Sequence, residues 1–243
     1  IHINFYTQNF NELNNILTQS SLNLNYSILY SPAKSEDLSD AINKTNESNS
    51  KLFLINGSNY GSLGSTIVQE LAFTLSELIE YIEAAKQSTT NLDEIVQKLT
   101  FQFSTGTSFF PEIAKYRAFR HLFSSICKEY GITTNETHVV STTNPYCFTT
   151  ADEHNNLLRA TTSTMAAIIG GCNEINVLGF NNNSSGNNNK NEAIRLAVNI
   201  QHILKYESFL DKVKDTSSGA FYIENLTKQM MEEAWKLVLK IEE

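Results

Sequence analysis

Short runs rich in β-branched and aromatic residues alternate along most of the chain with longer runs in which apolar residues recur every three or four positions. The short runs are typical of strands and the longer runs of helices. Six short runs predict strands, over residues 2–6, 26–30, 52–56, 99–104, 138–142 and 175–179. Their alternation with helices indicates βα units, in which consecutive strands lie parallel in one sheet.

Helix signals between the predicted strands support this assignment. The clearest apolar stripe consists of Ile67, Leu71, Leu75, Ile79 and Ile82. This spacing places the five side chains on one face of a helix. A second helix is expected to begin around Pro111, since proline is tolerated in a first turn, and to end at Gly131. A third helix is expected from near His154 to Gly170.

The last helix is expected over residues 228–241, with a buried side formed by Met231, Ala234, Trp235, Val238 and Ile241. No second domain boundary is visible, so we expect one α/β domain over residues 1–243. The chain begins at Ile1 without an initiator methionine or a signal-peptide pattern, and we expect this start to be a cut within a longer protein.

The run from residue 98 to residue 104 has the most informative local pattern. One parity consists of Lys98, Thr100, Gln102 and Ser104, and the other of Leu99, Phe101 and Phe103. Because side chains alternate between the two faces of a strand, this strand has a polar face and an apolar face. One interpretation is that the phenylalanines face helices while the polar residues line a lumen that holds water or a polar ligand. The other is an edge strand with one solvated face.

Hydroxyl and amide side chains also gather at the end of the predicted strand 138–142, in the run Ser141, Thr142, Thr143 and Asn144. Ligands of βα folds bind at the carboxyl ends of the strands, which makes Thr142 a candidate binding residue. Such clusters are also common in turns.

Charge and composition argue against several functional classes. The 26 acidic residues exceed the 18 basic residues and give a net charge of −8, which argues against nucleic acid as the main partner. No apolar run approaches the length of a membrane span. The widely spaced Cys127, Cys147 and Cys172 are typical of buried thiols in a reducing, cytoplasmic compartment. The five histidines show no metal-ligand spacing.

Five stretches resemble the substrate-barrel region of the methylmalonyl-CoA mutase family. They are residues 69–75 (QELAFTL), 109–120 (FFPEIAKYRAFR), 155–167 (NNLLRATTSTMAA), 197–208 and 219–227 (GAFYIENLT). The resemblance runs in family order from about residue 53 to the end. It implies a (β/α)8 TIM-type barrel, incomplete here with about six βα units, in which coenzyme A threads along the axis.

The resemblance also implies binding residues. In the family an Arg-x-Ser-x-Phe run contacts the coenzyme A ester, and the matching positions here are Lys98, Thr100 and Gln102. Lys98 keeps the positive charge of the arginine and Thr100 keeps the hydroxyl of the serine, whereas Gln102 replaces the aromatic ring. Together with the strand parity, the resemblance assigns substrate binding to Lys98, Thr100, Gln102, Ser104 and Thr142, and cofactor binding to Gln201.

The catalytic part of the resemblance is weaker. Active members have a Tyr-His pair directly after a glycine, and the imidazole donates a hydrogen bond to the thioester carbonyl. Here Gly57 is followed by Ser58 and Asn59, which cannot replace an imidazole. Active members also clamp the substrate carboxylate with an arginine from an earlier loop, whereas the first arginine here is Arg117, within a predicted helix. The resemblance therefore implies no catalytic residue in this chain.

The Asp-x-His-x-x-Gly motif of the family's cobalamin-binding domain is absent, since Asp152-Glu153-His154 is followed by Asn155, Asn156 and Leu157. We therefore expect no cobalamin-binding domain and no tightly bound cofactor in this chain. Adenosylcobalamin, which the family implies, would be bound by a partner.

The chain is most similar to the non-catalytic small subunit of heterodimeric members, which pairs with a catalytic mutase subunit. Self-association and the binding of an acyl-CoA are further expectations. An alternative is an active coenzyme A ester isomerase that uses groups upstream of Ile1. A third interpretation, a doubly wound nucleotide-binding domain, lacks the glycine-rich loop that should follow the first strand.

Overall fold

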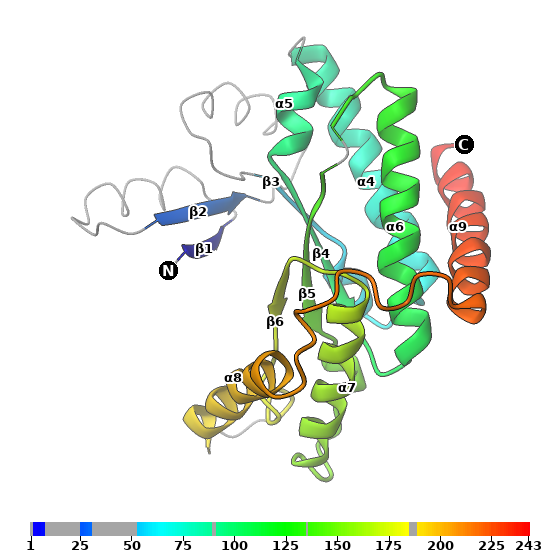
Figure 1. The fold of residues 1–243 in the computed structure, drawn as a ribbon. Helices are drawn as coiled ribbons and strands as arrows, with labels where there is room; N and C mark the ends of the chain where they lie inside the picture. The colour runs from blue at the N-terminus through cyan, green and yellow to red at the C-terminus, as the bar shows by residue number, and fades with distance from the viewer. Residues whose placement is uncertain (1, 8–24, 31–52, 89–90, 135, 185–188) are drawn as a thin grey trace, which may run out of the picture. The chain divides into compact units, whose positions relative to one another are not determined.

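The computed structural model describes residues 2–7, 25–30, 53–88, 91–134, 136–184 and 189–243 (Figure 1). Its strands are β1 (His2–Thr7), β2 (Asn25–Tyr30), β3 (Phe53–Asn56), β4 (Leu99–Thr105), β5 (His138–Thr143) and β6 (Glu174–Asn176). Each of the six predicted runs overlaps one of these strands, although β6 ends three residues earlier than expected. The α/β class is therefore confirmed, while closure into a barrel stays a prediction.

Helices occupy the intervals between most of the strands. They are α3 (Ser58–Ser62), α4 (Ile67–Ser88), α5 (Leu92–Gln97), α6 (Phe109–Glu129), α7 (Asn155–Ile169), α8 (Lys190–Tyr206) and α9 (Phe221–Glu242), with a 3-10 turn η1 (Pro145–Cys147) after β5. The pairs β1/β2, β2/β3 and β5/β6 are parallel, with Ile3 opposite Tyr26, Tyr30 opposite Phe53, and Ser141 opposite Ile175. Parallel strands joined through helices are what βα units require.

The chain divides into two compact units, and β4, α4 and α6 each pass from one unit into the other. The first unit comprises residues 1–56, 74–101 and 124–138, and its strands follow the order β1, β2, β3, β4. Its described core includes Leu54, Ile55, Leu75, Leu78 and Leu99, which are all buried.

The second unit comprises residues 57–73, 102–123 and 139–243 and contains the end of β4 followed by β5 and β6. The apolar face of β4 packs on α6: the ring of Phe103 lies 4.9 Å from that of Phe119 and 6.0 Å from that of Tyr116. Phe103 thus faces a helix, as the alternation along this strand predicts.

Two further apolar clusters hold the helices of the second unit. Helices α7 and α8 lie side by side near β6 (Figure 1), and the buried residues between these elements are Phe148, Ala160, Val177, Ala197, Ile200 and Leu204. A second cluster joins α6, α7 and α9 through Ile113, Ala166 and Ile223.

Helix α9 begins seven residues earlier than the sequence predicts, and its buried stripe consists of Ile223, Thr227, Met230, Ala234 and Val238. The prediction was wrong for Trp235 and Ile241, which are 38% and 42% exposed. The apolar residues of this helix occupy a band wider than one stripe, and Met230 and Thr227 pack inward in place of the larger tryptophan.

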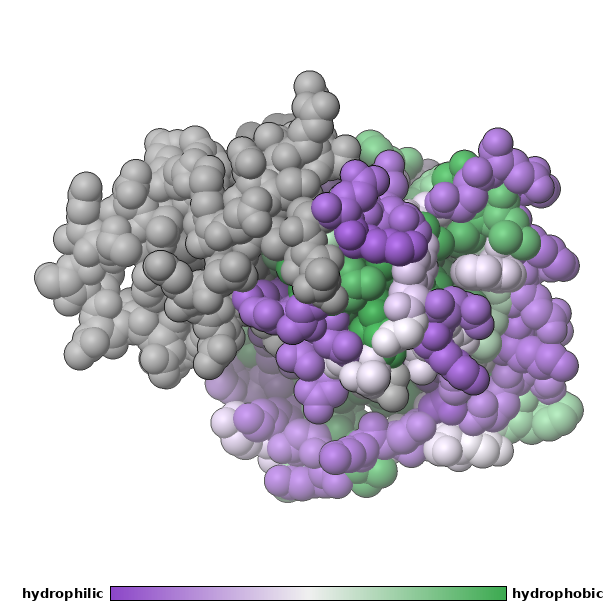
Figure 2. Space-filling model, turned by 90° about the horizontal axis from the view of Figure 1, so that it is seen from above, coloured by the Kyte–Doolittle hydropathy of each residue, from purple (hydrophilic) through white to green (hydrophobic). Residues whose placement is uncertain are grey.

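Among the described residues, none of the helices combines the length and the hydropathy that crossing a bilayer requires. On the face that Figure 2 shows, hydrophilic residues cover most of the coloured surface, with hydrophobic residues between them.

Candidate functional site

Three of the residues singled out from the sequence meet in the second unit. Ser58 follows β3, Gln102 lies on β4 and Thr142 on β5. The Gln102 Nε2 atom donates one hydrogen bond to Ser58 Oγ, at 3.1 Å, and another to Thr142 Oγ1, at 3.0 Å. Ser58 is buried, while Gln102 and Thr142 are half-buried. We call these three side chains the amide–hydroxyl cluster.

The amide–hydroxyl cluster contains neutral hydrogen-bonding groups only. A primary amide and aliphatic hydroxyls do not exchange protons near neutral pH, so they can orient a ligand but cannot act as general acid or base. Asn59, the neighbour of Ser58, is exposed. At the position where the resemblance places a Tyr-His pair, the structure therefore shows a bonded serine and an exposed asparagine.

The other predicted binding residues have different surroundings, and the prediction that Lys98 lies on this strand was wrong, because Lys98 ends α5 and β4 begins at Leu99. Lys98 forms an ion pair with Glu94 of α5, with 3.2 Å between Nζ and Oε1. Thr100 is fully buried, and its Oγ1 has no hydrogen-bond partner among the described residues. Ser104 is also buried and lies tightly against Gly61: a Cβ atom added to that glycine would lie 1.9 Å from Ser104 Oγ.

A buried ionic cluster, formed by Glu70, Glu112 and Lys115, lies at the end of β4. Lys115 Nζ is 2.9 Å from Glu70 Oε2 and 2.7 Å from Glu112 Oε2. The same ammonium group donates a hydrogen bond to the backbone carbonyl of Ser104. The backbone N–H groups of Ser104 and Gly106 donate to Glu70 Oε1, at 2.6 Å, and to Glu112 Oε1, at 2.8 Å. Helices α4 and α6 are thereby tied to the end of β4.

Burial and ion pairing oppose each other in this ionic cluster, and a different effect prevails at Glu70 and at Lys115. It raises the pKa of Glu70, and the nearby Lys115 opposes this shift without cancelling it. Burial alone would lower the pKa of Lys115, but the carboxylates of Glu112 and Glu70 outweigh it and raise that pKa. The lysine therefore stays charged and serves as a structural cation.

The ionic cluster was not predicted from the sequence. Glu112 and Lys115 are three residues apart among the apolar residues Ile113, Ala114 and Tyr116 of α6. Charged residues that interrupt the buried side of a helix were the available signal, because such residues are seldom buried unless paired.

A chain of hydroxyl groups connects α6 with β4 and β5. Thr105 Oγ1 lies 2.5 Å from Tyr116 Oη and 2.7 Å from Ser141 Oγ. Burial raises the pKa of Tyr116, so its phenol remains protonated at neutral pH. These buried hydroxyl groups fix the spacing of the strands next to the amide–hydroxyl cluster.

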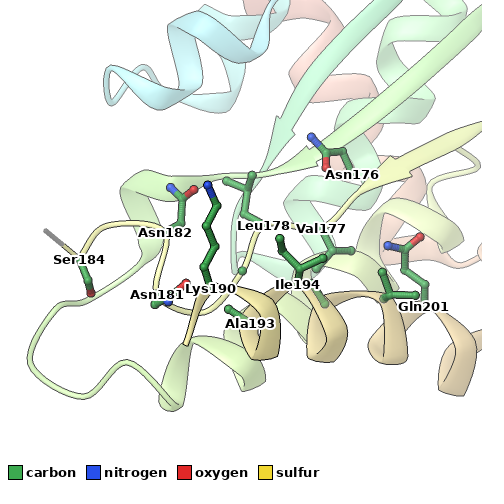
Figure 3. A pocket seen from close by; sticks show the side chains of 13 residues that line it. Asn176, Val177, Leu178, Asn181, Asn182, Ser184, Lys190, Ala193, Ile194 and Gln201 are labelled. Atoms are coloured by element: carbon green, nitrogen blue, oxygen red, sulfur yellow. The ribbon is translucent and has the colours of Figure 1, made fainter. Parts of the chain in front are cut away.

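Gln201, predicted to bind a cofactor, lies on α8 and lines a groove of about 550 Å³ between β6 and that helix (Figure 3). Val177, Ile194 and Val198 form apolar parts of the wall, and Lys190 lies toward the other end of the helical segment that lines it. Neither Gln102 nor Thr142 lines this groove. The structure therefore does not bring Gln201 together with the amide–hydroxyl cluster.

Groups that could ligate a metal or act as nucleophiles are scarce. No cluster of three or more His, Cys, Asp or Glu residues suited to a metal ion occurs in the described part of the chain. The three cysteines are free thiols, and burial raises the pKa of Cys172 to about 12. A thiol with that pKa is a poor nucleophile at neutral pH.

Comparisons with known proteins give one consistent result. A family model described as methylmalonyl-CoA mutase matches residues 14–243. The small subunit of methylmalonyl-CoA mutase from Porphyromonas gingivalis is 39% identical over 193 residues, which cover 78% of this chain and 31% of the relative. The mutases of Rhizobium meliloti and Escherichia coli are 34% and 33% identical, over 77% and 78% of this chain but only 26% and 27% of their own length. The chain thus spans less than a third of each of these relatives.

Proposed function

The chain belongs to the methylmalonyl-CoA mutase family, and on this premise we propose that it is a small-subunit-like barrel without catalytic groups of its own. In this role it pairs with a catalytic subunit that binds cobalamin and isomerises methylmalonyl-CoA and succinyl-CoA. Its own contribution is to hold the shape of the complex and to bind the coenzyme A arm of an acyl-CoA.

The observation that carries this proposal is the environment of Ser58. The resemblance places the Tyr-His pair of active members at Ser58 and Asn59. Ser58 Oγ accepts a hydrogen bond from Gln102, and Asn59 is exposed. Neither side chain can supply a proton donor of adjustable acidity to a thioester carbonyl.

In the described part of the chain, the stretch that comes nearest to the family's cobalamin motif does not fit cobalamin as a resident cofactor. In the Asp152-Glu153-His154 stretch the imidazole of His154 stacks on the ring of Phe180, with 4.8 Å between centroids, and Asn155 begins α7 directly afterwards. A histidine packed on an aromatic ring at a helix start is poorly placed to ligate a metal. Cobalamin binding is therefore assigned to the partner.

The alternation of polar and apolar residues along β4 supports a role of this chain in binding the coenzyme A arm. Thr100 and Gln102 share one parity of the strand, and Phe103, on the other parity, packs on α6. This supports a polar face of Thr100, Gln102 and Ser104, which Thr142 of β5 joins through its hydrogen bond with Gln102 and which Lys98 directly precedes in the chain. The free cysteines support a reducing, cytoplasmic location.

A turnover assay tests the absence of catalysis. The purified chain, supplied with adenosylcobalamin and methylmalonyl-CoA, should form no succinyl-CoA by itself. Affinity purification of the tagged chain from its native source should recover a larger subunit with the absorption spectrum of cobalamin. Turnover by the chain alone would overturn the proposal, as would purification without any cobalamin-containing partner.

A further inference from the structure

The groove between α8 and the end of β6 follows the edge of the sheet in the second unit (Figure 3). The residues that line its volume of about 550 Å³ come from two stretches, 176–184 and 190–201. Four consecutive residues, Asn176–Gly179, take part, so the groove follows the main chain of this stretch and not only one face of its side chains. In the sheet that the described residues form, β6 is the last strand. The outer edge of such a strand offers main-chain N–H and C=O groups to a further strand.

Helix α8 has an apolar row that its own packing does not use. The buried stripe of this helix consists of Ala193, Ala197, Ile200 and Leu204. Ile194 and Val198, four residues apart, line the groove instead and are 51% and 44% exposed. Gln201 continues this row about one turn further along the helix. The groove therefore has a partly exposed apolar wall that ends in an amide.

The polar groups that line the groove are neutral with one exception. Side-chain amides are contributed by Asn176, Asn181, Asn182 and Gln201. The exception is Lys190, which is exposed and forms no ion pair with any described residue, since the neighbouring Glu192 pairs with Arg195. The described residues of the lining include no Asp or Glu. A lone ammonium group beside neutral amides favours a ligand with one negative charge.

One chemical class combines an apolar face, amides and a single negative charge. An extended peptide presents main-chain amides along its length, side chains that alternate between two faces, and a carboxylate at its C-terminus. Figure 3 shows Lys190 and Asn182 toward one end of the groove, Gln201 and Asn176 toward the other, and Ile194 between them. A peptide whose terminal carboxylate meets Lys190 therefore runs parallel to β6, as β5 does.

We propose that the groove between β6 and α8 binds the C-terminal end of an extended peptide segment from a partner protein. Lys190 pairs with the terminal carboxylate, Ile194 and Val198 contact apolar side chains of the peptide, and the peptide main chain lies along the outer edge of β6. This inference goes beyond the proposed function and does not depend on it, because no residue of the amide–hydroxyl cluster lines the groove.

Fluorescence anisotropy on the full chain tests the role of Lys190. The probe is a labelled hexapeptide of alternating threonine and valine that ends in valine, with either a free C-terminal carboxylate or a carboxamide. The native chain should bind the carboxylate form about 3–10-fold more tightly, the effect of one charge-assisted hydrogen bond at a partly exposed site. Lys190→Met should bind both forms with equal affinity. Lys205→Met makes the same change on α8 outside the groove and should keep the preference.

The apolar wall provides a second arm of the experiment. Val198→Asp places a charge where the peptide side chains pack and should weaken the binding of both forms by about 10-fold or more. Ile203→Asp, at an exposed position of the same helix that does not line the groove, should leave both affinities unchanged. Circular dichroism should show the native helix content for both variants.

Three results would overturn the proposal. The first is the absence of saturable peptide binding by the native chain, and the second is a preference for the carboxylate form that survives in Lys190→Met. The third is displacement of the probe by dodecanoate as effectively as by the unlabelled peptide, since dodecanoate has a carboxylate and an aliphatic chain but no amides. None of these measurements involves coenzyme A or cobalamin, so their failure leaves the proposed function intact.

Discussion

The end of β4 is flanked by two polar clusters that differ in charge and in exposure. The ionic cluster of Glu70, Glu112 and Lys115 is fully buried, and its members bond to one another and to the backbone of Ser104 and Gly106. The amide–hydroxyl cluster of Ser58, Gln102 and Thr142 is neutral and partly exposed. The charges thus tie helices α4 and α6 to the end of β4, while the neutral side chains bond to one another at a partly exposed position.

The difference follows from the cost of burying polar groups. A buried charge is tolerated only when it is paired and hydrogen-bonded, and removal of one partner leaves an uncompensated charge. Neutral hydroxyl and amide groups at a partly exposed site can exchange their partners for water at small cost. We therefore expect substitutions in the two clusters to differ strongly in their effects on stability.

The largest effect is expected for Lys115→Met, which leaves two carboxylates buried without a cation. The free energy of unfolding should fall by about 3–5 kcal/mol, measured by urea denaturation. Lys236→Met, which removes an exposed lysine paired with Glu233, is the control and should change stability by less than about 0.5 kcal/mol. If Lys115→Met does not fold, a variant that also carries Glu70→Gln and Glu112→Gln should recover the fold. Equal effects at Lys115 and Lys236 would contradict a structural role for the ionic cluster.

Glu77 of α4 is a carboxylate that forms no ion pair with the described residues, in contrast to Glu70 and Glu112. Burial and the neighbouring Glu80 raise the pKa of Glu77 from 4.5 to about 7. Because the folded chain holds this proton more tightly than the unfolded chain, Glu77 costs stability increasingly as the pH rises from about 4.5 to 7. Glu77→Gln should therefore stabilise the chain by about 1–3 kcal/mol at pH 8 and by little at pH 4. Glu207→Gln, at an exposed position, is the control, and a gain that does not depend on pH would refute the explanation.

Gly61 packs closely against Ser104, the residue whose backbone bonds to Glu70 and Lys115 of the ionic cluster. Gly61→Ala would place a Cβ atom 1.9 Å from Ser104 Oγ and 2.7 Å from Ser104 Cβ. We expect a loss of about 1–2 kcal/mol from overpacking, visible as a lower thermal midpoint. Adding Ser104→Gly removes both clashing atoms, so the double variant should lose less than the sum of the two single variants. Strict additivity would show that the two positions are independent.

The smallest effect on stability is expected for Gln102→Leu. This change removes two neutral hydrogen bonds at a half-buried position and should cost less than about 1 kcal/mol in urea denaturation. Gln229→Leu on the surface of α9 provides the matched control. A loss as large as that of Lys115→Met would mean that the amide–hydroxyl cluster stabilises the fold as strongly as the ionic cluster does.

Local pattern was sufficient for the strands and for part of the site. Alternation along residues 98–104 correctly predicted that Phe103 packs on a helix. The binding role assigned to Gln102 and Thr142 stays a prediction, although the structure brings the two side chains together. The prediction of the buried face of α9 was wrong, since Trp235 is exposed. The apolar residues of this helix form a band wide enough for more than one choice of buried face, so their spacing alone does not decide which face packs inward.

The sequence by itself determined the order of strands and helices, the polar and apolar faces of β4, and the membership of the family, because these depend on residues close together in the chain. Only the tertiary structure decided that Lys115 pairs with Glu70, 45 residues away, and that Gln102 donates its amide hydrogens to Ser58 and Thr142. A hydrogen bond forms only when the distance between its donor and acceptor atoms is right to within a few tenths of an ångström. For residues that are distant in the chain, this distance is set when the helices pack on the sheet.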